Sequence, residues 1–418
     1  MHSSAQPAAI DSTAVSSNAS NAGQRDHAID ALRGFALLGI LLVNAGSFAS
    51  TYFGMGVPDP AFSRLGDQAV RWLVSLLFES KFYLLFSLLF GYSFALQMDS
   101  AQRAGSAFVP RFLRRLGGLA LLGLAHAWLL FAGDILLTYA LLGLVLLALR
   151  RLRPFSALVL ALTLLLTTAA GWGLLAWLVA QAPLHELPIA EVHAKAQYAA
   201  EAYRASAWDA ITQRGRDMAE GVWFVLVFVQ APCALAMFVL GLAAQRSGFL
   251  ASLANQPERL RRWMVFCLPL GVAGALFYAS AQGSPGAPQS DHVALAAMAV
   301  DLVTAPLLTF GYVAGLLWAF HHGAASHQLA AVLAPAGRMA LSNYLLQSMV
   351  GAVVFTAYGF ALVGRVAPWL VMAGALLLYG VQLVSSHWWM ARHAYGPAEW
   401  LLRAFTLWQW PAWRRRAE

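Results

Sequence analysis

The stretch LGGLALLGLAHAWLLFAGDILLTYALLGLVLLAL, residues 116–149, indicates the class of this protein. As one helix, the apolar run 114–149 would be about 54 Å long, whereas the hydrocarbon core of a bilayer is about 30 Å thick. Glycine often ends a helix and aspartate often caps the start of one, so Gly133 and Asp134 mark a break between two helices. The run therefore predicts two membrane helices in a tight hairpin, with its turn at 133–134 facing outward.

The composition of the whole chain supports the same class. Of its 418 residues 60% are hydrophobic and 11% are charged, and the mean hydropathy is +0.63. A soluble protein could not cover its surface with so few charges. Apolar runs of about 20 residues recur along the chain. We therefore predict an all-α, polytopic integral membrane bundle of about ten helices, at 33–51, 81–98, 114–132, 134–149, 155–180, 221–245, 263–281, 293–320, 341–359 and 367–391.

The positive charge of the chain predicts its orientation. The net charge is +8, which in a soluble domain would suggest nucleic acid as a partner. With the N-terminus inside the cell, 19 of the 27 Lys and Arg residues fall in cytoplasmic segments and 8 in outer ones. This asymmetry follows the positive-inside rule. It predicts that both termini are cytoplasmic and that the charge serves topology, with no nucleic-acid partner.

The remaining segments divide the chain further. We expect a disordered tail at 1–24, one transmembrane domain at 25–408 and a basic tail at 409–418. Within the domain, 62–80 is predicted to be an amphipathic helix on the outer surface, and 181–220 a long outer loop, either a lid or a connector. Cys233 and Cys267 lie in apolar segments and are expected to be buried and unbonded.

Three polar residues are predicted at a similar depth in the membrane. Asn44, His126 and Asp301 each lie about 9–12 Å below the outer edge, counted along their helices. Polar groups at such depth usually face the bundle interior or a cavity. His126 with Asp301 suggests a base and its orienting carboxylate. The alternatives are that His126 bonds a neighbouring carbonyl and that Asn44 bridges helices. Asp134 is predicted to cap the helix that follows it.

Arginines gather at the predicted inner ends of the spans. Such a set could hold a phosphate-rich ligand, or its members could snorkel and pair within the chain. The candidates are Arg33, Arg111, Arg114, Arg115 and Arg338. We expect no metal site, because His321, His322 and His327 have no partner at metal-ligand spacing.

Five stretches resemble the YeiB-like family of bacterial multi-pass membrane proteins, known as a domain of unknown function. They occur in the family's order, and the resemblance covers about residues 25–408. They are IDALRGFALLGILLVN (29–44), KFYLLFSLLFGYSFAL (81–96), GLAHAWLLFAGDILLTYALLG (123–143), GRMALSNYLLQS (337–348) and GPAEWLLRAFT (396–406). The resemblance implies a location in the bacterial inner membrane.

That family is similar in turn to transmembrane acyltransferases, namely the acyltransferase-three and heparan-glucosaminide acetyltransferase groups. The shared element is D-x-L-R-G, which here begins at Asp30. In the acyltransferase-three pattern a histidine follows fourteen residues later, where this chain has Asn44. The heparan-type enzymes also have Asn there and add a histidine shortly afterwards, whereas this chain has none between Asn44 and Arg71. His126 is the residue best placed to replace it.

The resemblance implies transfer of an acyl group from cytoplasmic acyl-CoA to a small-molecule or glycan acceptor outside. His126 would be the base, Asp301 its assistant and Asn44 a positioning group, and the arginines would hold the acyl-CoA. Two alternatives remain: a transporter that uses intramembrane His and Asp as a proton relay, and a non-catalytic scaffold or sensor. Membrane lipids are expected partners in every case. The oligomeric state is left open, because lipid-facing and partner-facing surfaces look alike.

Overall fold

The computed structural model describes residues 12–182, 189–254, 256–281, 291–321 and 324–414. Within these ranges the regular elements are helical, and β-pairing is confined to the bridge between His393 and Arg414. The all-α prediction is therefore confirmed. The helices are α1 (Ser12–Ala49), α2 (Leu65–Leu77), α3 (Lys81–Arg103), α4 (Phe108–Leu129), α5 (Leu136–Ala148), α6 (Pro154–Gln181), α7 (Ile189–Ala205), α8 (Ala207–Asp217), α9 (Trp223–Val225), α10 (Ala231–Arg246), α11 (Phe249–Ala254), α12 (Pro257–Ala281), α13 (Asp291–His321), α14 (Ala324–Arg338), α15 (Ala340–Phe355), α16 (Pro368–Arg392) and α17 (Pro397–Leu407).

Seven helical stretches of the described part are long and apolar enough to cross a membrane, and up to eight if the bent pair α14–α15 counts as one span. The two helices of this pair meet at an angle of 75°. The ten predicted spans include two further helices, α4 and α5, which form the hairpin. With 13 residues, α5 is only about 20 Å long, shorter than the hydrocarbon core.

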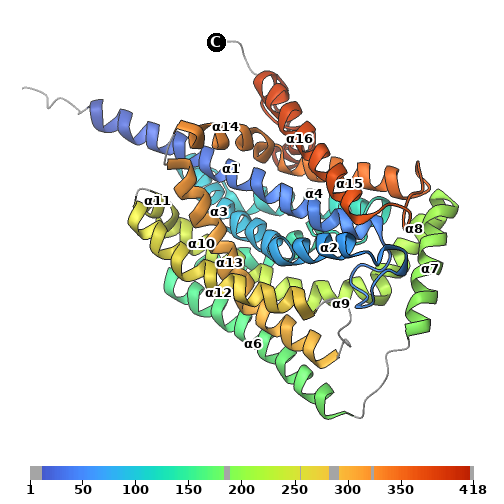
Figure 1. Cartoon of the computed structure of the whole chain (residues 1–418). Coiled ribbons are helices and arrows are strands. Elements are labelled where there is room, and N and C mark those ends of the chain that lie inside the picture. The colour runs from blue at the N-terminus through green and yellow to red at the C-terminus, as the bar shows by residue number, and fades with distance from the viewer. Residues whose placement is uncertain (1–11, 183–188, 255, 282–290, 322–323, 415–418) are drawn as a thin grey trace, which may run out of the picture.

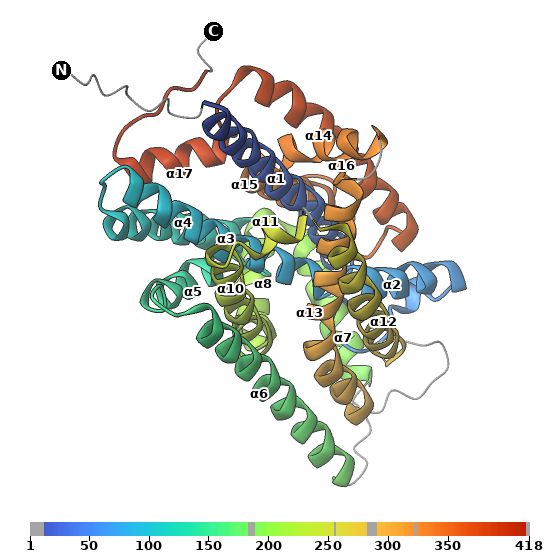
Figure 2. The ribbon, with the colours of Figure 1, turned by 90° about the vertical axis from the view of Figure 1, so that its left-hand side faces the viewer.

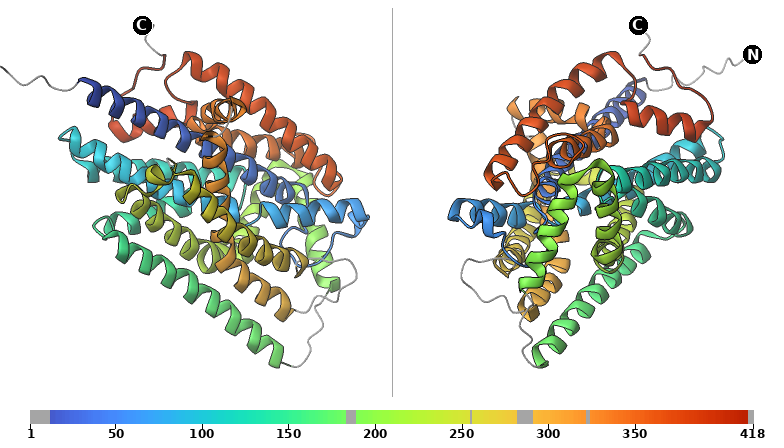
Figure 3. Two further views of the ribbon diagram at one scale, coloured as in Figure 1. Left: turned by 60° about the vertical axis from the view of Figure 1, so that its left-hand side comes forward. Right: turned by 90° about the vertical axis from the view of Figure 1, so that its right-hand side faces the viewer.

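The helices form one bundle in which α1 packs on α3, α14, α15 and α16 (Figure 1). Figure 2 shows α17 beside α4, on the side of the molecule where α1 begins. Figure 3 shows α7 and α8 at the opposite side. By the predicted topology, the first side is cytoplasmic and the second is outside.

Glycines let α1 and α14 touch backbone to backbone. A Cβ at Gly34 would lie 2.2 Å from the carbonyl oxygen of Leu333, and one at Gly337 would lie 1.8 Å from that of Asp30. Both distances are far below van der Waals contact. Small residues at helix crossings are typical of membrane bundles, in which close packing replaces the hydrophobic effect between helices. Two of the motifs quoted above, IDALRG and GRMALSN, therefore meet at this crossing.

A second crossing of the same kind joins α3 and α10. A Cβ at Gly91 would lie 1.9 Å from the carbonyl oxygen of Phe238, and one at Gly241 would lie 2.1 Å from that of Leu88. Leu88 and Phe238 are themselves fully buried. The two glycine crossings hold α1 against α14 and α3 against α10.

The segments predicted outside the membrane are helical. Helix α2 keeps Leu65, Leu73 and Leu77 exposed, whereas Leu76 is buried against α12, so its apolar residues are divided between the exposed side and the bundle. The predicted loop 181–220 contains α7 and α8. Helix α8 continues through the π-helical stretches η2 (Met218–Val222) and η3 (Leu226–Gln230) into α10, giving a continuous helix Ala207–Arg246.

The division of the chain into two tails and one transmembrane domain stays a prediction. Helix α1 begins at Ser12, so helical backbone extends into the segment 1–24. At the other end, Ala394 N–H donates to the Trp413 carbonyl at 3.2 Å, so the chain folds back on the end of α16.

Replacing Gly337 with Ala should destabilise the protein, because the new methyl would overlap a backbone oxygen that cannot move aside. We expect a loss of about 1–3 kcal/mol or more, seen as a lower apparent melting temperature in detergent. The matched control is Gly380→Ala in α16, where a Cβ meets nothing within 4 Å. That variant should be neutral or slightly more stable. Equal melting temperatures for both variants would contradict the crossing.

Candidate functional site

The hairpin of α4 and α5 brings a histidine and an aspartate together. Helix α4 ends at Leu129 and α5 begins at Leu136, so the predicted break at 133–134 is confirmed. A Cβ at Gly123 would lie 2.5 Å from the Leu137 nitrogen and 2.8 Å from Asp134 Oδ2. Glycine at this position therefore lets the start of α5 lie directly against α4.

His126 and Asp134 form a buried dyad in this hairpin. His126 Nδ1 donates to Asp134 Oδ1 at 2.8 Å, and both side chains are buried. Asp134 Oδ2 accepts from the Leu137 N–H at 2.7 Å. His126 Nε2 is buried and has no hydrogen-bond partner among the described residues. The carboxylate thus caps α5 and fixes the imidazole tautomer, which leaves Nε2 as a free acceptor.

The prediction that Asp134 caps the helix that follows it is confirmed. Asp134 has a second role that was not predicted, because it also binds His126. The prediction that Asp301 orients His126 is wrong, because Asp301 lies on α13 and pairs with Lys81 instead, with Nζ to Oδ1 at 3.4 Å. Depth in the membrane can be counted along a helix, but the direction in which a side chain points within the bundle cannot. The missed signal was the hairpin itself, which folds residue 134 back toward residue 126.

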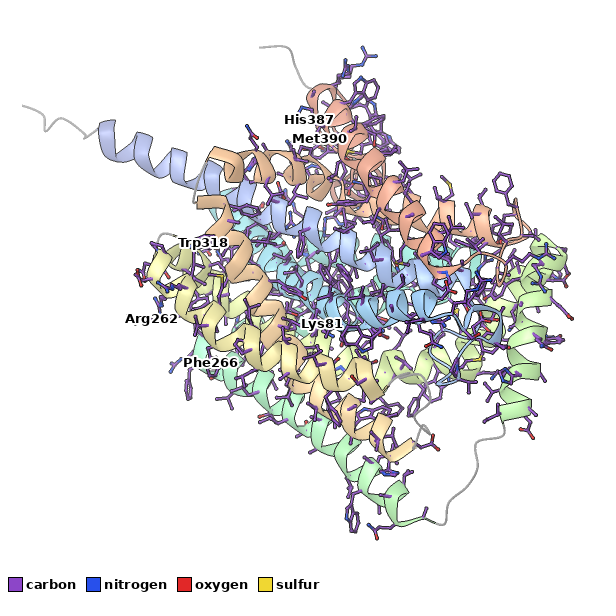
Figure 4. The ribbon with its side chains drawn as sticks, viewed as in Figure 1. Lys81, Arg262, Phe266, Trp318, His387 and Met390 are labelled. Carbon is purple, nitrogen blue, oxygen red and sulfur yellow. The ribbon has the colours of Figure 1, made fainter. Side chains whose placement is uncertain are left out.

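Lys81 and Asp301 form a second buried charged pair. Neither side chain has exposed surface of more than 1%. Lys81 Nζ also donates to the Ser75 carbonyl at 3.2 Å and lies 5.7 Å from the centre of the Tyr278 ring. Figure 4 shows Lys81 inside the bundle. The sequence placed Lys81 at the end of a span and so gave no sign of this pair. The third predicted residue, Asn44, is half-buried on α1.

A cavity of about 320 Å³ opens on the side where α4 begins, between α3, α4 and α17. Polar and apolar side chains share its lining, and three arginines belong to it. The lining is Gln97, Ser100, Ala101, Ala104, Phe108, Arg111, Phe112, Arg115, Tyr395, Glu399, Arg403, Thr406 and Leu407. None of the residues predicted to be catalytic lines this cavity.

The one carboxylate in the cavity lining is held by the start of α15. Glu399 accepts from the backbone N–H groups of Leu341 at 2.7 Å and Ser342 at 3.2 Å, and from the Ser342 hydroxyl at 2.5 Å. Burial raises the pKa of Glu399, and these hydrogen bonds oppose that rise. A carboxylate at a helix N-terminus is stabilised there by the helix dipole. Glu399 is therefore engaged by α15 and does not form an ion pair with an arginine of the cavity.

The three arginines give the cavity a net positive charge. Arg403 lies over the Tyr395 ring at 5.0 Å, and Arg111 donates to the Ser106 hydroxyl at 2.8 Å. Arg115 is half-buried and has no hydrogen bond or ion pair with the described residues. Guanidinium groups of this kind bind phosphate or carboxylate oxygens. The cavity is therefore suited to an anionic ligand.

Of the five arginines predicted to bind one ligand, only Arg111 and Arg115 line the cavity. Arg33 is paired with Asp30 at 2.6 Å and also donates to Ser93. Arg114 donates to the carbonyl of Pro110, and Arg338 is exposed at the end of α14. Arg403, which the predicted set omits, belongs to the cavity. Its sequence signal was its place in GPAEWLLRAFT.

One helix carries both the cavity and the dyad. Arg115 lies near the start of α4 and His126 near its end, about 16 Å apart along the helix axis. The described residues contain no group of three or more His, Cys, Asp or Glu that could hold a metal ion. The side chains of His321, His322 and His327 lie outside the described part. Cys233 and Cys267 are buried and free, as predicted.

The chain is similar to uncharacterized bacterial proteins along nearly its whole length. The family described as "Protein of unknown function (DUF418)" matches residues 244–409. The uncharacterized protein YxaH of Bacillus subtilis (strain 168) is 32% identical over 412 residues, covering 93% of this chain and 95% of that protein. The uncharacterized protein YeiB of Escherichia coli (strain K12) is 28% identical over 404 residues, covering 92% and 97%.

Removing one partner of the Lys81–Asp301 pair should destabilise the protein more than removing both. Lys81→Met or Asp301→Asn leaves an uncompensated buried group and should cost about 3–5 kcal/mol. The double variant should recover a large part of that loss, measured by thermal unfolding in detergent as a double-mutant cycle. Additive effects of the two substitutions would show that the two groups do not interact.

Proposed function

The chain belongs to the YeiB-like family of DUF418 proteins, and we propose that it is a transmembrane acyltransferase of the bacterial inner membrane. It would transfer an acyl group from cytoplasmic acyl-CoA to an acceptor on the outer side, with both termini in the cytoplasm. The observation that carries the proposal is the placement of two sites on α4. An arginine-lined cavity lies toward its N-terminal end, and a His–Asp dyad with a free Nε2 lies near its C-terminal end.

The cavity supplies the donor side. Arg111, Arg115 and Arg403 would bind the phosphates of acyl-CoA, and Tyr395 or Phe108 offers a ring face for the adenine. The pantetheine arm would then extend along α4 toward His126. Arg115 is the residue on this path, because it lies deeper along α4 than Arg111 and has no hydrogen bond or ion pair with the described residues.

The dyad supplies the base. His126 Nε2 would take the proton from a hydroxyl or amine of a small-molecule or glycan acceptor, while Asp134 stabilises the imidazolium that forms. The acceptor oxygen or nitrogen bonds to the acyl carbon, the carbon–sulfur bond breaks, and the proton passes from His126 to the leaving thiolate. Asn44 would hold the acyl carbonyl or the acceptor. No metal is needed for this sequence of steps.

The Lys81–Asp301 pair favours a second candidate function, a proton-coupled transporter. Buried charged pairs at membrane depth often mark proton pathways. Reconstituted liposomes separate the two functions. Transport moves a solute without changing it and depends on Lys81, whereas acyl transfer releases free CoA and leaves a modified acceptor.

Asp134→Asn should abolish acyl transfer without unfolding the protein. The asparagine oxygen can still accept from the Leu137 N–H, but its amide would then donate to His126 Nδ1. The imidazole proton would move to Nε2, where a base needs a lone pair. We expect a loss of about two to four orders of magnitude, measured as label passed from acetyl-labelled acetyl-CoA to other molecules in membrane vesicles.

His126→Ala should lose the same activity, and His193→Ala is the matched control. His193 lies on α7 and contacts the Tyr52 hydroxyl at 3.1 Å, away from the dyad. The His193→Ala variant should retain the acyl-transfer activity of the wild type. If Asp134→Asn and His126→Ala both retain full activity, the dyad is not the base.

Arg115→Gln should weaken CoA binding to the purified protein in nanodiscs. Losing one hydrogen-bonded charge contact costs about 1.5–3 kcal/mol, which corresponds to a roughly tenfold to hundredfold increase in Kd. Arg403→Gln should behave in the same way. Arg114→Gln is the control, because this neighbouring arginine does not line the cavity. Equal losses in all three variants, measured by calorimetry, would indicate a general charge effect.

A further inference from the structure

A buried arginine lies on the side of the bundle opposite the arginine-lined cavity. Arg214, on α8, is only 2% exposed. Its guanidinium carbon lies 5.6 Å from the centre of the Tyr203 ring and 4.9 Å from that of the Tyr358 ring. Its Nη1 donates to the Tyr358 hydroxyl at 3.1 Å. Two tyrosines from separate parts of the chain thus hold this guanidinium in one position.

The charge of Arg214 has no counter-ion in the described protein. Asp217 lies one turn further along, but its carboxylate accepts from the Tyr203 hydroxyl at 2.5 Å and from Gln213 Nε2 at 2.8 Å. No carboxylate of the described residues lies within ion-pair distance of Arg214. Its Nη2 is buried without a hydrogen-bond partner, as is Gln213 Oε1. A buried, unpaired charge is costly and calls for a partner from outside the chain.

The surroundings of Arg214 also resemble a site rather than a packing contact. Directly after α8, the helix passes through the two π-helical stretches η2 and η3. Such π-helical insertions are rare and occur frequently at functional sites. A Cβ at Gly215 would lie 3.8 Å from the ring of Trp128, so α8 packs beside the end of α4 that carries His126.

We propose that Arg214 binds a small oxyanion, a carboxylate or phosphate group, at the outer face of the protein. Nη2 would donate to an oxygen of the anion, and the two tyrosine rings would keep the guanidinium in place. Guanidinium suits this role because it presents several donors in one plane to carboxylate or phosphate. The group could belong to a soluble solute or to a lipid headgroup. The binding does not depend on the proposed acyl transfer.

Thermal stability of the purified full chain tests the proposal. The protein in phosphatidylcholine nanodiscs is titrated with sodium phosphate or sodium acetate, with sodium chloride at equal ionic strength as the reference. A ligand that binds the folded state raises the melting temperature in a concentration-dependent manner. We expect this rise for the wild type, and a roughly tenfold or greater increase in apparent Kd for Arg214→Gln.

The matched control is Arg216→Gln. Arg216 is an exposed arginine two residues away that binds the Tyr198 hydroxyl. The melting temperature of the Arg216→Gln variant should rise with the anions as that of the wild type does. Arg214→Lys is the second test variant, to be used if Arg214→Gln does not fold. It keeps the charge but presents a compact ammonium that cannot both reach Tyr358 and present a second donor, so it too should bind about tenfold more weakly.

A parallel arm identifies the source of the anion. Nanodiscs with phosphatidylglycerol replace those of phosphatidylcholine alone, without added anion. An Arg214-dependent rise with free phosphate or acetate assigns a soluble ligand, and one with phosphatidylglycerol only assigns a lipid headgroup. The proposal is overturned if neither source stabilises the wild type, or if the Arg214 variants are stabilised as strongly as the wild type.

Discussion

The close backbone contact at glycine is the constraint on which this bundle depends. Between apolar helices in a bilayer, burial of apolar surface gives no driving force, because the lipid is equally apolar. The helices must instead fit closely, and Gly34 against Leu333 and Gly337 against Asp30 provide that fit at the crossing of α1 and α14. Helix α15 follows α14 directly, and its start holds Glu399, which lines the arginine-lined cavity.

Several buried carboxylates in the bundle are held by specific partners, whereas eight buried side-chain polar atoms of the described residues have no hydrogen-bond partner. Glu399 is held by the N-terminus of α15, Asp301 by Lys81 and Asp134 by His126. The Nε2 of His126 and the Nη2 of Arg214 are the two of these eight atoms that belong to basic side chains, and an unsatisfied buried polar group is costly. A ligand that completed either group would remove this cost, which is the basis of both proposed sites.

The sequence predicted much of the fold, because apolar runs and helix breaks have clear signals. The hairpin break at 133–134, the all-α class and the buried free cysteines are confirmed. The pairing of polar residues was harder to predict. His126 and Asp301 lie at a similar predicted depth, yet they face different helices. Counting along a helix gives depth, whereas partners depend on helix rotation and lateral packing, which long-range contacts such as the glycine crossings decide.

The positions of the charged groups along α4 bear on whether the protein acts across the membrane. Arg115 lies at the start of this helix, His126 lies near its end, and Arg214 lies beside that end. Two unpaired guanidinium groups thus lie on opposite sides of the bundle, with a His–Asp dyad on the helix that links them. A transporter with one central site would not need separate anion contacts on both faces. The two proposed anion contacts, with the proposed base between them, would suit a reaction in which donor and acceptor approach from opposite sides.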